Sequence, residues 1–318
     1  MINLEDVKSA ARRVSTFVIE TPLEKSQTLS QLLGTNVYLK MELFQKTGSF
    51  KPRGAFNHIL QLDGQVKDRG VVAVSGGNFA QGVAYAASQL GIKAVICMPE
   101  YTPSNYVEAT KSYGATVELS PDFPSTFAKA ETFKSEGYAF LHAWDNPNQM
   151  AGNGTIGLEI LERLPYVTDI VISIGGGGLI AGITVAIKAI KPNVRIWGVE
   201  TEGAQTMGKA LEAGKVVQIT PNSLAKTLSA TYVAEDALRI AQQYMEQYVV
   251  VSDQEAIDSQ RFLLERAKVL TELAASCTLS AAKKISSRFQ KQGHVVLLLC
   301  GGNESLSNMI AYTKHMQV

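Results

Sequence analysis

The chain has 318 residues, enough for one large domain or two, and its 46% hydrophobic and 19% charged residues are typical of a soluble globular protein. Thirty Lys and Arg against 29 Asp and Glu leave a net charge of +1, which argues against a basic surface for nucleic acid or anionic membranes. Three cysteines without CxxC spacing argue against a disulfide framework and a zinc site. We therefore expect a soluble cytoplasmic protein with no nucleic-acid or membrane partner.

Short apolar runs rich in β-branched residues alternate with helical patterns along nearly the whole chain. The first element is an amphipathic helix in residues 1–14, whose acidic residues distinguish it from a secretory leader. Seven strands are predicted, at 37–40, 71–74, 94–97, 116–119, 170–174, 194–199 and 294–300. Helices are predicted at 54–62, 80–90, 104–112, 124–135, 155–162, 179–190, 236–248, 253–269 and 274–290.

Several of these strands are apolar throughout, as strands covered by helices on both faces should be. Strands that alternate with helices through short connections predict parallel sheets. The pattern forms two blocks that meet near residues 145–148, where turn-forming residues cluster. We therefore predict an α/β fold of two three-layer αβα domains with mostly parallel sheets. Residues 1–69 and 147–318 would form the larger, cofactor-binding domain, and residues 70–146 the smaller one.

The sharpest local signal is a run of four glycines, Gly175, Gly176, Gly177 and Gly178, followed by Leu179. The run lies between a predicted apolar strand and a predicted helix, so its backbone N–H groups and the helix N-terminus could converge on one phosphate. Neither a Walker sequence nor the GxGxxG pattern of dinucleotide-binding proteins is present. The alternative interpretation is a tight turn without a ligand.

A second signal is Lys51, which stands before Pro52 at a predicted helix start. The positive end of a helix favours the neutral, nucleophilic form of an amine. Most lysines are solvated surface charges, so this position alone is weak. A lysine combined with a phosphate site but no nucleoside motif suggests pyridoxal phosphate, an aldehyde that lysine holds as a Schiff base.

Two further loops follow predicted strands. Ser75, Gly76, Gly77 and Asn78 offer backbone N–H groups and polar side chains to a carboxylate or a ring hydroxyl, although a simple helix cap is the alternative. Cys300 ends the last strand, where a thiol could contact a bound ring; buried cysteines are more often only small apolar residues.

The ordered motifs make a family recognisable. The chain resembles the fold-type II pyridoxal-phosphate enzymes, specifically the short threonine/serine dehydratase and serine racemase group. The resemblance covers essentially the whole chain and rests on KTGSFKPRGA from Lys46, SGGNFAQGVA from Ser75, AGNGTIGLEI from Ala151, GGGGLIAG from Gly175 and CGGN from Cys300.

The resemblance implies a role for each candidate residue. Lys51 would carry the cofactor, with Phe50 beside it, and Asn78 would contact the ring 3-hydroxyl. Gly175 to Gly178 and Leu179 would hold the phosphate, and Cys300 would face the pyridine nitrogen. The loop of Ser75, Gly76, Gly77 and Asn78 would bind the substrate carboxylate. A homo-oligomer, either a dimer or a tetramer, is also implied.

This sequence departs from the family pattern at several positions. Phe79 replaces a usual His, and Asn153 a usual Gln. Glu200 matches an acidic residue that holds a divalent cation in some relatives. The second expected carboxylate is Thr206, so we expect that cation site to be impaired, and the sequence does not decide whether a metal binds. In a segment that is usually Ala-Asp-Gly, the chain has Ala225 followed by Lys226 and Thr227. A second unusual segment spans residues 271–275.

We expect an ammonia-lyase that converts L-threonine or L-serine to a 2-oxo acid and ammonia. Lys51 would remove the α-proton, and loss of the β-hydroxyl would follow. A racemase is the main alternative, but it needs an acid or base on each cofactor face, and Gly76 stands where racemases have a serine. A β-replacement synthase and a non-catalytic homologue are minor alternatives.

Lys226 adds a hypothesis about the substrate. If its ammonium points into the site, it would attract an acidic side chain, which favours 3-hydroxyaspartate over threonine. If Lys226 lies on the outer surface of its loop, as lysines usually do, the preference is ordinary.

Overall fold

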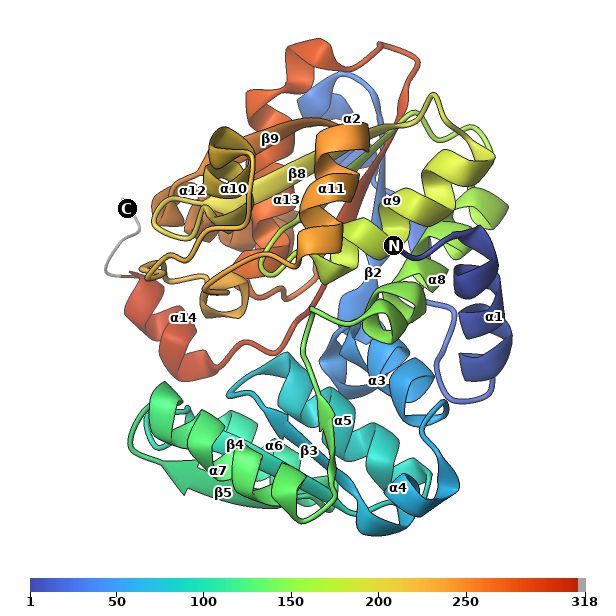
Figure 1. Ribbon diagram of the computed structural model, residues 1–318. Coiled ribbons are helices and arrows are strands. Elements are labelled where there is room, and N and C mark those ends of the chain that lie inside the picture. Colours follow the sequence, from blue (N-terminus) through green and yellow to red (C-terminus); the bar gives the residue numbers. More distant parts are fainter. Residues whose placement is uncertain (314–318) are drawn as a thin grey trace.

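The computed structural model describes residues 1–313 and contains two sheets (Figure 1). The larger sheet has the strand order β1-β2-β10-β7-β8-β9, and β1 is antiparallel to β2 while the other pairs are parallel. The smaller sheet has the order β5-β4-β3-β6 and is entirely parallel. The strands are β1 Leu23–Lys25, β2 Asn36–Met41, β3 Val71–Val74, β4 Ala94–Pro99, β5 Thr116–Ser120, β6 Ala139–Leu141, β7 Asp169–Ser173, β8 Arg195–Thr201, β9 Met245–Val251 and β10 His294–Leu299.

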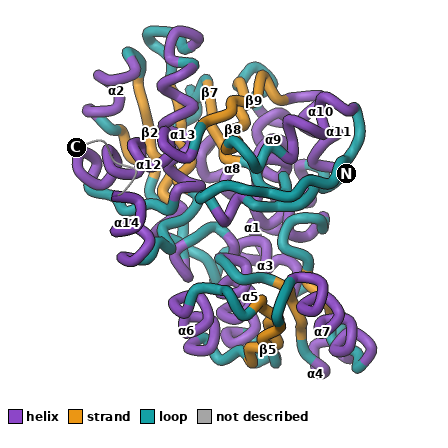
Figure 2. Tube along the Cα trace, turned by 90° about the vertical axis from the view of Figure 1, so that its left-hand side faces the viewer, coloured by secondary structure: helices purple, strands orange, loops and turns teal. Residues whose placement is uncertain are grey.

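Helices cover both sheets, which confirms the predicted α/β class (Figure 2). Helices α8 and α9 pack against each other, with α1 beside them, and α13 packs on β7, β8, β9 and β10. The α-helices are α1 Leu4–Val14, α2 Gln27–Leu33, α3 Lys51–Ile59, α4 Gly64–Arg69, α5 Asn78–Gln89, α6 Ser104–Ser112, α7 Phe123–Ser135, α8 Pro147–Arg163, α9 Gly178–Ile190, α10 Thr206–Ala213, α11 Glu235–Tyr244, α12 Asp253–Phe262, α13 Leu273–Lys284 and α14 Leu306–Thr313.

The two central strands of the smaller sheet, β3 and β4, show why such strands are apolar throughout. Side chains alternate between the two faces of a strand. Ala73 and Ile96 belong to a core cluster with residues of α3 and α5, whereas Val72 and Val95 belong to a second cluster with Ala130 of α7. Each face of β3 and β4 therefore has its own helical layer, and these two central strands are almost entirely buried.

Several boundaries differ from the predicted ones. The helix predicted at 236–248 ends at Tyr244, because the following run Met245–Val251 pairs with β8 as β9. The helix predicted at 155–162 begins at Pro147, where Asn146 accepts hydrogen bonds from the first N–H groups. A π-helical turn at Leu263–Ala267 ends the helix predicted at 253–269 early. The short elements β1, β6, α2, α4 and α10 were not predicted.

The parallel strands place the four motif loops at strand carboxyl ends. The loop to Lys51 follows β2, the loop Ser75–Gly77 follows β3, the four-glycine run follows β7, and Cys300 follows β10. In open parallel α/β sheets, ligands bind at the carboxyl edge. The fold thus directs the predicted site residues of both sheets towards one region.

Candidate active site

Lys51 is the first residue of α3, and its amine lies among apolar groups. Its Nζ donates a hydrogen bond to the carbonyl of Ala143 at 3.2 Å. The ring centroids of Phe50 and Phe79 lie 4.9 and 5.5 Å from this nitrogen. Burial lowers the pKa of Lys51 to about 8, although Cys300 and Glu272 raise it in part. The neutral amine, which a nucleophile or a base requires, is therefore far more populated near pH 8 than in an ordinary lysine.

Buried ion pairs fix the helix that carries Lys51. Arg53, two residues further along α3, contacts both oxygens of Glu42 at 2.8 and 2.9 Å. On its other side it donates to Glu159 of α8, which also pairs with Lys40 of β2. The side chains of Arg53 and Glu42 are fully buried. Two cations and two carboxylates thus tie α3 to β2 and α8.

The four-glycine run is packed so closely that side chains would not fit. A Cβ built on Gly176 would lie 2.1 Å from the Trp144 ring, and one on Gly178 would lie 2.8 Å from the Trp144 carbonyl. Gly177 has φ +87°, a conformation that favours glycine, and precedes the first turn of α9. Exposed backbone N–H groups at a helix N-terminus suit a phosphate. With the neutral amine of Lys51, this loop fits the phosphate and aldehyde of pyridoxal phosphate.

The loop after β3 carries the residues that the sequence predicts to bind the substrate carboxylate. The hydroxyl of Ser75 accepts a hydrogen bond from the Gly77 N–H, and the chain then enters α5 at Asn78. A Cβ built on Gly76 would meet the hydroxyl of Thr102 at 2.7 Å. Thr102 therefore occupies the space that a side chain at position 76 would need.

Glu272 is a buried site residue that the sequence did not single out. Its two carboxylate oxygens accept hydrogen bonds from Asn78 Nδ2 at 3.0 and 2.9 Å, and one lies 4.0 Å from the thiol sulfur of Cys300. Burial raises its pKa to about 7, while hydrogen bonds from Asn78 and Thr227 lower it. Because Glu272 and Asn78 are 194 residues apart, no local pattern could connect them.

An aromatic cluster borders the glycine run, and sequence reasoning missed it too. The ring of Trp144 contacts those of His142 and Tyr232, with centroids 4.7 and 5.5 Å apart. The N–H groups of Trp144 and Asp145 donate to His142 Nδ1, so the ring proton of the neutral imidazole is on Nε2, facing the Tyr232 hydroxyl. Burial also lowers the pKa of His142.

The structure shows the surroundings of the residues that depart from the sequence pattern of the resembled family. Phe79 is buried beside Lys51, and Asn153 donates from Nδ2 to the Gly178 carbonyl at 3.4 Å. Lys226 is exposed, which gives no support to a substrate with an acidic side chain. Glu200 accepts hydrogen bonds from the N–H groups of Met207 and Gly208 at the start of α10. Within residues 1–313, no group of three His, Cys, Asp or Glu side chains is arranged to hold a metal ion.

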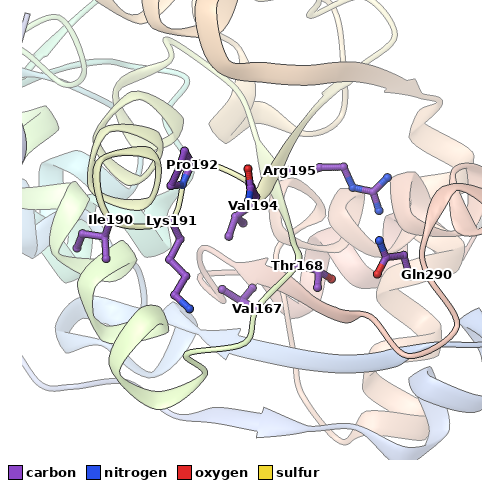
Figure 3. A pocket seen from close by; sticks show the side chains of 9 residues that line it. Val167, Thr168, Ile190, Lys191, Pro192, Val194, Arg195 and Gln290 are labelled. Carbon is purple, nitrogen blue, oxygen red and sulfur yellow. The ribbon is translucent and has the colours of Figure 1, made fainter.

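A cavity of about 540 Å³ lies elsewhere, at the amino ends of β7, β8 and β10 (Figure 3). Thr168, Arg195 and Gln290 are among its lining residues. Arg195 is paired with the buried Asp169 at 2.8 Å. The cavity is therefore at the opposite edge of the sheet from the glycine run, and it contains none of the predicted site residues.

Comparison with known proteins identifies the family. A family model described as pyridoxal-phosphate dependent enzyme matches residues 14–301. An L-threonine ammonia-lyase from Thermotoga maritima is 40% identical over 98% of this chain and 77% of its own length. A catabolic L-threonine dehydratase from Staphylococcus aureus is 36% identical over 99% of this chain and 93% of its own length.

Solved structures agree with this assignment. A maize serine racemase superposes with a TM-score of 0.93 and 30% identity, covering 98% of this chain and 97% of its own. A threonine deaminase from Solanum lycopersicum superposes with a TM-score of 0.93 and 31% identity, covering 99% of this chain and 92% of its own. Among the helices of residues 1–313, none combines the length and apolar character needed to cross a bilayer. The chain belongs to the pyridoxal-phosphate dependent enzyme family and uses pyridoxal phosphate as its cofactor.

Proposed function

We propose that this protein is an L-threonine or L-serine ammonia-lyase that forms a 2-oxo acid and ammonia. The observation that carries the proposal is the amine of Lys51, which is held among apolar side chains with its pKa near 8. An amine of this kind can both carry an aldehyde and remove a proton at neutral pH. The two lyase relatives, at 40% and 36% identity, support the same reaction.

Each part of the site has a role in this proposal. Gly175, Gly176, Gly177, Gly178 and Leu179 bind the cofactor phosphate through backbone N–H groups at the start of α9. Phe50, Asn78 and Cys300 would line the ring of the bound cofactor. The loop of Ser75, Gly76, Gly77 and Asn78 binds the substrate carboxylate.

The reaction then depends on transfer of the substrate α-proton to Lys51 Nζ. The bound cofactor supplies an electron-withdrawing ring, which makes the α-proton of the substrate acidic. Lys51 Nζ takes that proton, and apolar Phe50 and Phe79 exclude water around it. The Ala143 carbonyl, which accepts from Nζ, orients the amine.

Racemisation is the weaker alternative, although several structural neighbours carry racemase names. A racemase must return a proton to the opposite face of Cα, and Gly76 has no group that could do so. The close contact between Gly76 and Thr102 also leaves little space for a serine there.

The test is a panel of L-threonine, L-serine, D-serine and threo-3-hydroxyaspartate, with 2-oxo acid, ammonia and the enantiomer of the remaining amino acid all measured. We expect equal amounts of 2-oxo acid and ammonia from L-threonine or L-serine. Accumulation of the opposite enantiomer without ammonia would instead assign a racemase. Preference for hydroxyaspartate would restore the Lys226 hypothesis.

We also infer that the protein forms a homo-oligomer. Several large apolar side chains are at least one-third exposed, among them Phe44, Leu264, Leu270 and Leu306. Exposed apolar groups of this size favour burial against another surface. Light scattering after size-exclusion chromatography tests this, and a monomer at micromolar concentration would contradict it.

A further inference from the structure

The amide of Asn78 is held from two sides, although it lies on α5 and its partners follow distant elements. Its Nδ2 donates to both oxygens of Glu272, at 3.0 and 2.9 Å. Its Oδ1 accepts from Asn303 Nδ2 at 2.8 Å. Glu272 immediately precedes α13, and Asn303 follows β10, so elements that belong to the larger sheet and its helices supply both contacts.

These contacts allow only one orientation of the amide. Asn303 Nδ2 also donates to the Thr47 carbonyl at 2.7 Å, and a carbonyl can only accept. The same nitrogen therefore faces Asn78, which requires the Asn78 oxygen on that side. A reversed Asn78 amide would place its oxygen against the Glu272 carboxylate and its nitrogen against the Asn303 nitrogen, losing all three hydrogen bonds of the Asn78 amide.

Glu272 is itself firmly placed. Its N–H donates to the Gly301 carbonyl at 3.1 Å, and the Thr227 hydroxyl donates to its carboxylate at 3.1 Å. The residue is 5% exposed. The ionisable groups that act on it are Lys51 of α3, Glu304 after β10 and the Cys300 thiol.

We infer that Glu272 and Asn303 are positioning residues, which turn the Asn78 amide so that an N–H faces the ring 3-hydroxyl of the cofactor. If the two carboxylate oxygens share one hydrogen of Nδ2, the second hydrogen would be available to the ring oxygen. The inference rests on the proposed function, which places Asn78 at that ring. It adds the two residues that determine which end of the amide the cofactor meets.

The test compares pyridoxal phosphate with the analogue that lacks the ring 3-hydroxyl. Dissociation constants for both are measured by absorbance in the wild type, Asn78→Ala, Glu272→Gln and Asn303→Ala. One net hydrogen bond predicts that the wild type binds pyridoxal phosphate about tenfold more tightly than the analogue. In all three variants this ratio should fall to about two or less. Loss of packing alone would weaken both ligands and leave the ratio unchanged.

Glu304→Gln is the matched control, because Glu304 acts electrostatically on Glu272 but does not bond Asn78. It should keep the wild-type ratio. The pH midpoint of the visible band of the bound cofactor is a second readout, which Glu272→Gln should lower because a negative charge near Lys51 is removed. Circular dichroism shows whether each variant folds. If Glu272→Gln does not fold, Asn303→Ala still tests the inference.

Two results would overturn the inference. One is a wild-type ratio near one, and the other is a wild-type ratio retained by folded Glu272→Gln and Asn303→Ala. Failure of the proposed function looks different: the wild type would bind cofactor with the expected ratio but release no ammonia from any hydroxy amino acid.

Discussion

Lys51 owes its reactivity to its apolar surroundings. Its amine donates a hydrogen bond to the Ala143 carbonyl, and two phenylalanine rings lie within 5.5 Å. A cation in such a place loses hydration without a full ionic partner, so its pKa falls to about 8. The position of the lysine at a helix start suggested this from sequence, but the second phenylalanine, Phe79, was counted only as a departure from the family.

A pH prediction follows at this residue. The cofactor-free enzyme should capture pyridoxal phosphate at a rate that rises about tenfold per pH unit below pH 8 and levels off above it, because only the neutral amine attacks. Borohydride trapping at a series of pH values measures the rate. Free N-acetyl-lysine, the control, should continue to rise towards pH 10.5. A midpoint near 10.5 for the enzyme would contradict the assigned environment.

Position 176 requires glycine because the Trp144 ring leaves no space for a side chain there. In Gly176→Ala the new methyl carbon would lie 2.1 Å from the Trp144 ring, so either the ring or the loop must move. We expect destabilisation of about 1–3 kcal/mol and much weaker cofactor binding. Gly64→Ala is the control, because nothing lies within 4 Å of its new carbon. Urea unfolding and a cofactor titration check both variants, and equal behaviour would contradict the packing argument.

Elements were predictable where a pattern was long and uniform. Strands β3, β7 and β10 were located within about one residue, because β-branched apolar runs between turn residues have few alternatives. The helix predicted before β9 extended too far along the chain. The run Met245–Val251 contains residues compatible with both helical and strand periodicity, and only its pairing with β8 makes it a strand. The three-residue strands β1 and β6 have too few residues for any periodicity.

The site was predictable in the same uneven way. Loops that follow strands carry their own glycine and polar patterns, so the four motifs were found. The roles of Glu272, Asn303 and Trp144 depend on contacts between distant segments, so no local pattern could reveal them, although Asn303 ends the CGGN motif. Glu272 was noted only inside an unusual segment, without a role.

Helix α3 depends on its buried charges, which gives a prediction at this scale. Glu42→Gln removes one carboxylate from Arg53 where neither side chain is exposed, and we expect a loss of about 3 kcal/mol in the free energy of unfolding. Glu20→Gln, which breaks the exposed pair with Arg163, should change it little. Urea unfolding of both variants is the measurement. Equal effects would show that the buried network does not anchor α3.

At the scale of the whole molecule, the smaller sheet supplies Ser75 to Asn78 and the larger sheet supplies the glycine run, Glu272 and Cys300. Contacts join the two parts directly: Asn78 meets Glu272, and the Tyr106 hydroxyl of α6 donates to the Asn303 carbonyl at 2.7 Å. The division into domains at residues 70 and 146 stays a prediction. A substrate carboxylate between these parts would hold them closed and exclude water.

Hydrogen exchange tests that arrangement. Adding an amino-acid substrate analogue to the holoenzyme should slow exchange of the amides of residues 76–78, because they would bind the carboxylate. The amides of α7, on the far side of the smaller sheet, should be unaffected. Protection of α7 without protection of 76–78 would place the carboxylate elsewhere.

The central claim is that Lys51 Nζ performs the chemistry of an ammonia-lyase, and one measurement tests it most directly. Ammonia and 2-oxo acid released from L-threonine and L-serine are followed for the wild type, Lys51→Ala and Lys8→Ala, each supplied with pyridoxal phosphate. Lys8, exposed on α1, is the control. We predict that Lys8→Ala retains wild-type turnover, whereas Lys51→Ala remains folded and loses at least about 10³-fold. Near wild-type ammonia release by Lys51→Ala would contradict the account.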